Sequence, residues 1–292
     1  MRILILGGDG MLGHRLLLHL QERHETKVTL RRGLPEYGQY GLFTPENSYT
    51  GVEARDVERL LEVFGDFRPE AVVNCVGIIK QRGEAKEAIP SIEINALLPH
   101  RLAVACKAIG ARLVHLSTDC VFSGRKGDYT LEDVPDAEDL YGRTKLLGEV
   151  GEEPAVTLRT SIIGLELARK GSLIEWFLAQ RGEIRGFTEA IYTGLTTAEM
   201  SRVIEKVLVE HPDLSGVWQV ASEKIDKYDL LSRFSRELGR DDVSVTPDAS
   251  VKIDRSLSGL EFAKATGYDP PGWDAMLAEL ALEVQARKRQ GS

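Results

Sequence analysis

A tyrosine and a lysine stand four residues apart in the segment DLYGRTKLLGE, as Tyr141 and Lys145. Residues at positions i and i+4 of an α-helix share one face, so the two side chains can act at one site. A phenol with its ordinary pKa of about 10 is a poor acid or base at neutral pH. A neighbouring ammonium lowers that pKa toward the range in which general acid–base catalysis works best. The pair therefore predicts a proton-transfer site.

The spacing alone is weak evidence, because the chain has 8 tyrosines and such a pair also arises by chance. Its position about twenty residues after the segment LSTDCVFSG strengthens the prediction. Thr118 directly follows a predicted strand, at the sheet edge where doubly wound folds bind ligands, and its hydroxyl would polarise a substrate carbonyl. The hydroxyl of Ser117 competes for that role. Asp119 is interpreted as a turn cap.

A glycine-rich turn, GGDGMLG, follows the first predicted strand and places Gly7, Gly10 and Gly13 three residues apart. The spacing is a variant of the G-x-G-x-x-G dinucleotide fingerprint. Gly7 would permit the tight turn, Gly10 the approach of phosphate oxygens, and Gly13 close packing of the helix on the strand. The alternative is a turn needed only for helix–strand packing. The position of GGDGMLG between a strand and an amphipathic helix favours nucleotide binding instead.

The second predicted strand ends in VTLRRG, with Arg31 and Arg32 and no acidic residue. An acidic side chain here favours NAD, whereas a positive one accommodates the 2′-phosphate of NADP. The two arginines predict NADP(H), with NAD(H) as the alternative cofactor and a solvated basic turn as the alternative without function.

These residues lie within a regular alternation of apolar runs and helical patterns. Strands are predicted at 2–6, 26–30, 71–75, 112–117 and 155–163, and helices at 11–22, 57–64, 92–110 and 141–150. Repeated βα units predict an α/β fold with a Rossmann-type, doubly wound parallel sheet. After Gly164 the pattern weakens: helices are predicted at 172–180, 197–210, 227–238 and 273–287, around one clear strand at 216–222.

Two domains follow from this change of pattern. Residues 1–164, completed by roughly 194–222, are predicted to form an NADP(H)-binding Rossmann domain. Residues 165–193 and 223–292 are predicted to form a smaller mixed α/β domain that binds the substrate.

Composition excludes several classes of protein. A net charge of -8 argues against a nucleic-acid binder or a basic membrane-surface protein. No window approaches 18 apolar residues, and MRILILGG does not resemble a signal peptide. Cys75, Cys106 and Cys120 lack metal-site spacing and predict no disulfide framework, so no metal is expected and a reducing cytoplasm fits best.

Several segments match one family in order along the chain: GGDGMLG, ARDVERL, RPEAVVNCVG, INALLPHRLA, LSTDCVFSG, YGRTKLLGE, TLRTSIIG, GLTTAEMSRVI and DRSLSGLEFAKATG. Together they resemble the extended short-chain dehydrogenase/reductases, and within them the dTDP-4-dehydrorhamnose reductase-like group. The resemblance covers nearly the whole chain. LSTDCVFSG with YGRTKLLGE is its most specific part, and the C-terminal segments are weaker.

The resemblance implies roles for particular residues. Thr118, Tyr141 and Lys145 would be catalytic, with Lys145 also bonded to the nicotinamide ribose. The implied cofactor contacts are Gly7, Gly10, Met11, Leu12, Gly13, Arg31, Arg32, Asp56, Val57, Cys75, Val76, Gly77, Asn95, Tyr141 and Lys145. The implied substrate contacts are Ser123, Trp176 and Arg255.

Some of these positions carry a second interpretation. Arg255, with Arg185 or Lys252, would meet the substrate phosphates. Trp176 is predicted to pack in the core, and stacking on the sugar or base is the alternative. Pro99 cannot donate a hydrogen bond to the carbonyl of Asn95, so a helix kink is predicted there. The resemblance implies that this carbonyl holds a water linked to Lys145, and a kink required only by packing is the equal alternative.

The sequence departs from the group at three places. Cys75, Val76 and Gly77 replace the usual alanines, Gly194-Leu195-Thr196-Thr197 replaces Gly-x-Pro-Thr, and Arg255-Ser256 replaces Arg-Pro. These changes bear on the identity of the sugar rather than on the cofactor chemistry.

The expected function is NADPH-dependent reduction of a nucleotide-linked 4-keto-6-deoxy sugar, with Tyr141 as the proton donor. A sugar-nucleotide 4-epimerase with tightly bound NAD(P) and a non-catalytic NADP-binding regulatory subunit are the alternatives. A nucleotide-diphosphate sugar is the expected partner, a homodimer is implied by the resemblance, and neither nucleic acid nor membrane is expected.

Overall fold

Short, fully apolar runs such as Ile3–Leu6 form the central strands of a computed structural model that describes residues 1–79, 87–168 and 170–290. By its internal contacts the chain divides into two units. The first unit comprises Met1–Thr118, Glu138–Arg159 and Ser201–Trp218. The second unit comprises Asp119–Ala137, Thr160–Met200 and Gln219–Ser292. The sequence-based first domain also included the segments 119–137, 160–164, 194–200 and 219–222, which lie in the second unit.

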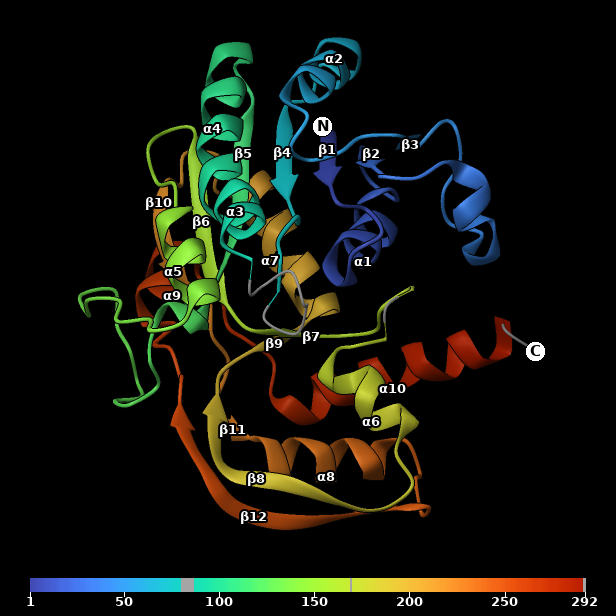
Figure 1. Cartoon of the computed structure of the whole chain (residues 1–292), viewed down its shortest axis with the longest axis vertical. Helices are drawn as coiled ribbons and strands as arrows, with labels where there is room; N and C mark the ends of the chain where they lie inside the picture. The colour runs from blue at the N-terminus through green and yellow to red at the C-terminus, as the bar shows by residue number, and fades with distance from the viewer. Residues whose placement is uncertain (80–86, 169, 291–292) are drawn as a thin grey trace. The chain divides into compact units, whose positions relative to one another are not determined.

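The first unit is built on a seven-stranded sheet of order β10-β6-β5-β4-β1-β2-β3 (Figure 1). Its strands are β1 (Arg2–Leu6), β2 (Glu25–Thr29), β3 (Ser48–Tyr49), β4 (Ala71–Asn74), β5 (Arg112–Thr118), β6 (Ala155–Thr160) and β10 (Gly216–Gln219). β1 pairs in parallel with β2 and β4, and β4 pairs in parallel with β5. The predicted Rossmann-type fold is confirmed.

Helices follow most of these strands. They are α1 (Met11–Leu20), the 3-10 helix η1 (Leu34–Tyr40), α2 (Val57–Phe67), α3 (Ala88–Ser91), the π-helix η3 (Ile92–Leu97), α4 (Leu98–Ile109), α5 (Leu140–Leu147) and α7 (Thr197–Val209). β4 and β6 are buried along their whole length, as expected for parallel strands covered on both faces. On one face Leu4 and Leu6 of β1 and Val72 of β4 pack with Phe64 of α2 and Leu102 of α4.

The helix predicted at 92–110 is confirmed, and it changes its winding near its start. Residues Ile92–Leu97 form a π-helix, and α4 continues from Leu98. Pro99, from which a helix kink near Asn95 was predicted, lies just after this change of winding. The strand predicted at 155–163 is two strands, β6 and the short β7 (Ile162–Ile163), which pairs in parallel with β9 (Leu195–Thr196).

The second unit contains a three-stranded sheet of order β11-β8-β12. β8 (Gly182–Tyr192) runs parallel to β12 (Val243–Asp254) and antiparallel to β11 (Ile225–Asp226). Its helices are η4 (Asp119–Val121), α6 (Leu173–Ala179), α8 (Lys227–Glu237), α9 (Leu260–Thr266) and α10 (Trp273–Gln290). The strand predicted at 216–222 is confirmed as β10 of the first sheet, whereas β8, β11 and β12 were not predicted from the sequence.

Packing explains why these strands escaped the sequence analysis. β12 has only one buried residue and contains Pro247, so it has no buried apolar run. In β8 a Cβ atom on Gly186 would lie 2.6 Å from the Cα atom of Tyr228, so the strand has a glycine where α8 rests on it. Glycine and proline inside a strand obscure the apolar alternation by which strands are recognised.

Among the described residues, none of the helices combines the length and apolar character needed to cross a lipid bilayer.

Candidate active site

The glycine turn between β1 and α1 has the conformation that its glycines predict. Gly7 adopts φ of +81°, which favours glycine, and its carbonyl accepts a hydrogen bond from the Gly10 N–H at 3.1 Å. A Cβ atom on Gly13 would overlap the Gly7 carbonyl oxygen, so only glycine lets α1 approach the turn this closely. Gly8, to which the sequence analysis gave no role, lies against Val28 of β2.

The first residues of α1 complete this turn. Gly10 is the N-cap residue, Met11 is half-buried and Leu12 is buried. The first turn of α1 contains no acidic side chain. Backbone N–H groups at a helix N-terminus favour a negatively charged ligand, so the turn has the chemistry to hold a diphosphate.

The segment after β2 places the two arginines at the surface. Arg31 and Arg32 are exposed, and Arg32 forms an ion pair with Glu36 at 2.9 Å. Tyr37 of η1 donates a hydrogen bond to Asp9 of the glycine turn at 3.4 Å. Burial and the negative charge of Asp9 raise the pKa of Tyr37. The segment after β2 is thus connected to the glycine turn.

The segments after β3 and β4 carry the other expected cofactor contacts. Asp56 caps α2 by accepting a hydrogen bond from the Arg59 N–H at 3.0 Å, and Val57 begins that helix. Cys75, Val76 and Gly77 are half-buried directly after β4. A Cβ atom on Gly7 would lie 3.0 Å from Val76, so the turns after β1 and β4 are adjacent.

Asn95 lies in η3 and fastens the segment after β4. Its side-chain oxygen accepts a hydrogen bond from the Ile78 N–H at 2.9 Å, and its amide nitrogen donates to the Ile78 carbonyl at 3.0 Å and to Thr144 at 3.3 Å. A Cβ atom on Gly148 would overlap the Asn95 carbonyl oxygen, so this carbonyl is packed closely against Gly148.

The predicted catalytic residues lie on β5 and α5. Thr118 is the last residue of β5 and is buried, and Tyr141 is half-buried in the first turn of α5. Asp139 fixes the start of α5 by accepting a hydrogen bond from the Gly142 N–H at 2.7 Å. Lys145 is buried, and its Nζ donates to the Leu116 carbonyl at 2.5 Å. This bond holds the Lys145 side chain against β5, at a residue two positions before Thr118.

The charge state of Lys145 depends on its surroundings. Burial lowers the pKa of its ammonium to about 8, against an opposing effect of Glu149. The Glu149 carboxylate accepts hydrogen bonds from Arg159 at 2.8 and 2.7 Å and from the Ser117 hydroxyl at 2.7 Å. The hydroxyl of Ser117, the alternative to Thr118, is thus engaged with Glu149.

Two buried residues near Lys145, His115 and Asn74, have no role predicted from the sequence. The Nε2 atom of His115 faces Lys145 Nζ at 3.5 Å, and its Nδ1 atom faces the Asn74 amide at 3.1 Å. The signal was a histidine within an otherwise apolar run, RLVHLS. Buried polar groups require partners, so such a residue marks a polar network.

The predicted substrate contacts all lie in the second unit. Ser123 donates to Asp136 at 2.6 Å through its hydroxyl, and Arg255 donates to the Phe122 carbonyl at 2.9 Å. Trp176 on α6 is 40% exposed, so the prediction that it packs in the core is wrong. The side chains of Arg185 and Lys252 are 78% and 87% exposed.

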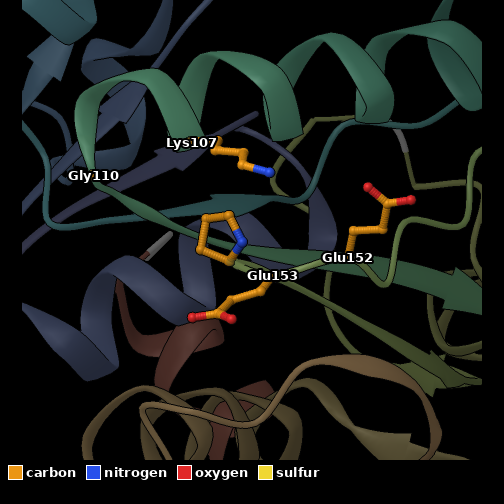
Figure 2. Close-up of a pocket in the computed structure, with 5 residues that line it drawn as sticks. Lys107, Gly110, Glu152 and Glu153 are labelled. Atoms are coloured by element: carbon orange, nitrogen blue, oxygen red, sulfur yellow. The ribbon is translucent and has the colours of Figure 1, made fainter.

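A cavity of about 450 Å³ lies elsewhere in the first unit. Figure 2 shows its lining residues, which are Lys107, Gly110, Glu152, Glu153 and Pro154. Gly110 precedes β5 and Pro154 precedes β6, so the cavity lies at the amino ends of these strands. The glycine turn and Thr118 lie at the carboxyl ends of β1 and β5, where doubly wound folds bind ligands. The cavity is therefore not the candidate active site.

Comparison with known proteins agrees with this geometry. A family model described as the RmlD substrate binding domain matches residues 1–258. The chain belongs to the RmlD substrate binding domain family. The resemblance drawn from the sequence motifs is thereby confirmed.

Two curated proteins match parts of the chain. Methionine adenosyltransferase 2 subunit beta of Rattus norvegicus is 33% identical over 152 residues, 51% of this chain and 41% of that protein. A dTDP-4-dehydrorhamnose reductase of Streptomyces griseus is 32% identical over 149 residues, 51% of this chain and 43% of that protein. The match thus spans less than half the length of either relative.

A solved structure resembles the chain over nearly its full length. The dTDP-4-dehydrorhamnose reductase of Bacillus anthracis str. Ames in complex with NADP superposes with a TM-score of 0.74 and 21% identity. The match covers 97% of this chain and 99% of that chain. It shows that the two proteins share a fold.

Proposed function

We propose that this RmlD-family protein reduces a nucleotide-linked 4-keto-6-deoxy sugar with NADPH. The observation that carries the proposal is the hydrogen bond between Lys145 and β5. Lys145 lies one helical turn after Tyr141, and its Nζ donates to the carbonyl of Leu116, two residues before Thr118. Tyr141, Lys145 and Thr118 would supply the proton donor, the cation and the hydrogen-bond donor that carbonyl reduction needs.

Each of these residues has a distinct task. Tyr141 gives its phenolic proton to the substrate oxygen as that oxygen gains charge, and Thr118 donates a hydrogen bond to the same oxygen. The Lys145 ammonium favours the phenolate left behind. A nicotinamide cofactor, when bound, supplies the hydride that reaches the carbonyl carbon.

The glycine turn supports a dinucleotide cofactor. The left-handed Gly7 and the absence of a side chain on Gly13 leave backbone N–H groups at the start of α1 for a diphosphate. The reductase of Bacillus anthracis was solved in complex with NADP. Arg31, exposed after β2, is the proposed partner of the 2′-phosphate, whereas Arg32 is paired with Glu36.

The second unit is the proposed source of the substrate contacts. Arg255 is half-buried, and its guanidinium is oriented by the Phe122 carbonyl, a suitable geometry for meeting a diphosphate. The exposed ring of Trp176 is proposed to pack on the sugar or base.

Removal of one oxygen atom tests this function. NADPH oxidation is measured against a panel of dTDP- and UDP-linked 4-keto-6-deoxy sugars, and Tyr141→Phe is expected to lower kcat by roughly 10²- to 10⁴-fold, the usual contribution of general acid catalysis. NADPH binding should persist. Tyr228→Phe, on α8 of the second unit, is the matched control and should retain activity. Undiminished turnover by Tyr141→Phe would refute the assignment.

A non-catalytic subunit is the second candidate, because the rat relative is named as a subunit of a methionine adenosyltransferase. It predicts NADPH binding by the wild-type protein with no turnover of any sugar in the panel. A 4-epimerase would instead interconvert sugar nucleotides without net consumption of NADPH. NADPH oxidation with the panel therefore separates the reductase from both alternatives, and interconversion of sugar nucleotides separates the epimerase from the subunit.

A further inference from the structure

Asn74 and His115 form a buried polar pair behind Lys145. Asn74 is the last residue of β4, and the parallel register pairs it with His115 of β5. Asn74 is 1% exposed and His115 is 0% exposed. A buried amide and a buried imidazole are costly unless their polar atoms are hydrogen-bonded, so their orientation is strongly constrained.

The orientation of the Asn74 amide is set by the chain that follows it. Its side-chain oxygen accepts a hydrogen bond from the Val76 N–H at 3.1 Å, which turns its nitrogen toward His115. That nitrogen lies 3.1 Å from His115 Nδ1. An amide nitrogen can only donate, so Nδ1 must be the acceptor and the imidazole proton must be on Nε2.

The Nε2–H group of this tautomer points at a second donor. Nε2 lies 3.5 Å from Lys145 Nζ, which also donates to the Leu116 carbonyl at 2.5 Å. An ammonium has three N–H donors and no lone pair, whereas a neutral amine can accept one hydrogen bond. The imidazole N–H therefore disfavours the ammonium and suits the amine.

We propose that His115 is a positioning residue for Lys145: Asn74 holds it as the Nε2–H tautomer, and this N–H orients the Lys145 nitrogen and favours its neutral form. This role stands apart from hydride transfer. Its catalytic consequence rests on the proposed function. When Lys145 loses its proton, Tyr141 loses the neighbouring positive charge, so His115 helps to set the upper pH limit of the reaction.

Other titratable groups near Lys145 also bear on its charge. Tyr141 lies one turn before Lys145 on α5. Glu149 lies just beyond the C-cap residue Gly148, and its charge favours the ammonium. Arg159 offsets that charge through its two hydrogen bonds to Glu149. On α4, the Nε2 atom of His100 faces the Leu147 carbonyl at 2.8 Å.

The titration behaviour of both groups agrees with the geometry. Burial, followed by the charges of Lys145 and His100, holds the pKa of His115 well below its ordinary value, so the imidazole is neutral. Burial lowers the pKa of Lys145 to about 8, which places its charge change closer to neutral pH.

The tautomer is tested first on the wild-type protein without substrate. Imidazole ¹⁵N NMR should show a neutral His115 with the proton on Nε2 throughout pH 6 to 9. A resonance pattern with the proton on Nδ1, or an imidazolium in this range, would overturn the proposal. Because no catalysis is measured, the result is independent of the proposed reductase activity and of any variant.

The effect on Lys145 is tested by moving the imidazole proton. In Asn74→Asp, one carboxylate oxygen can accept from Val76 and the other from an Nδ1–H, so the proton moves to Nδ1 and Nε2 becomes an acceptor for the ammonium. The ¹³Cε resonance of Lys145, assigned by its loss in Lys145→Met, should then titrate on the order of one pH unit higher than in wild type.

The new negative charge also raises this midpoint, so Asn74→Asp is repeated in the His115→Phe background. The expected shift in that background is markedly smaller, because no imidazole remains to relay the change. Equal shifts with and without His115 would show that charge alone acts, and would refute the positioning role. If a double variant does not fold, the wild-type tautomer still decides.

Discussion

Lys145 is a buried cation whose environment does not fully compensate it. Its Nζ is bonded to the Leu116 carbonyl, and the Glu149 carboxylate, whose charge favours the ammonium, is already bonded to Arg159. Moving a charge from water into the protein interior raises its free energy, and one hydrogen bond to a carbonyl offsets only part of this increase. The protein therefore maintains a titratable amine at the expense of stability, which is common at sites that move protons.

Lys145→Met should stabilise the fold at pH 7. The ammonium has a pKa of about 8 in the folded state and 10.5 without the fold, a difference worth about 3 kcal/mol at most. Between these values the unfolded chain binds more protons, so wild-type stability rises with pH and the advantage of Lys145→Met shrinks. Urea unfolding at pH 7 and pH 10.5 measures this. The surface variant Lys107→Met is the control. A pH-independent difference would contradict the buried-charge interpretation.

At the scale of elements, the turn between β1 and α1 depends on close backbone approach. Gly13 lies inside α1, where glycine is normally unfavourable by about 1 kcal/mol relative to alanine. It is retained because the Gly7 carbonyl occupies the space that a Cβ atom would need. The helix can then direct its N-terminal N–H groups at a ligand held by the turn.

Two helical glycines provide a matched comparison. Gly13→Ala should lower the melting temperature and weaken NADPH binding by at least tenfold, because the Cβ atom displaces α1 from the turn. Gly65→Ala, in α2, meets no atom within 4 Å of its new Cβ and should raise stability by about 0.5 to 1 kcal/mol. Thermal denaturation and cofactor titration measure both variants. Equal effects would argue against a steric role for Gly13.

The same scale shows the limits of sequence patterns. Apolar runs predicted β1, β2, β4, β5 and β6 to within a few residues, because each is short, buried and flanked by helices. β8 and β12 were missed because glycine, proline and exposed polar residues interrupt their alternation. For the site, local spacing indicated Tyr141 and Lys145. The effect of Glu149 on Lys145 could not be predicted in this way, because it depends on the hydrogen bonds between Glu149 and Arg159 of β6.

At the scale of the whole molecule, the preference between NADPH and NADH can be measured by how much each cofactor stabilises the fold. A ligand that binds only the folded state stabilises it by about 2.7 kcal/mol at one hundred times its Kd. We expect NADPH to raise the melting temperature more than NADH at equal concentration. Arg31→Ala should remove most of this difference, whereas Arg32→Ala, which breaks an exposed pair with Glu36, should preserve it. Equal stabilisation of wild type by NADH would contradict the inference from the two arginines.

Residue types and their spacing along the chain were sufficient to predict the βα repeat, the glycine turn, the tyrosine–lysine pair and the family. Each of these features depends on contacts within a few residues or on one element's period. The charge of Lys145 was decided by tertiary structure. His115 lies 30 residues before Lys145 in the chain, and Asn74, which sets its tautomer, belongs to a third element. A pKa depends on burial and on neighbours in space, and only the packed sheet places these groups together.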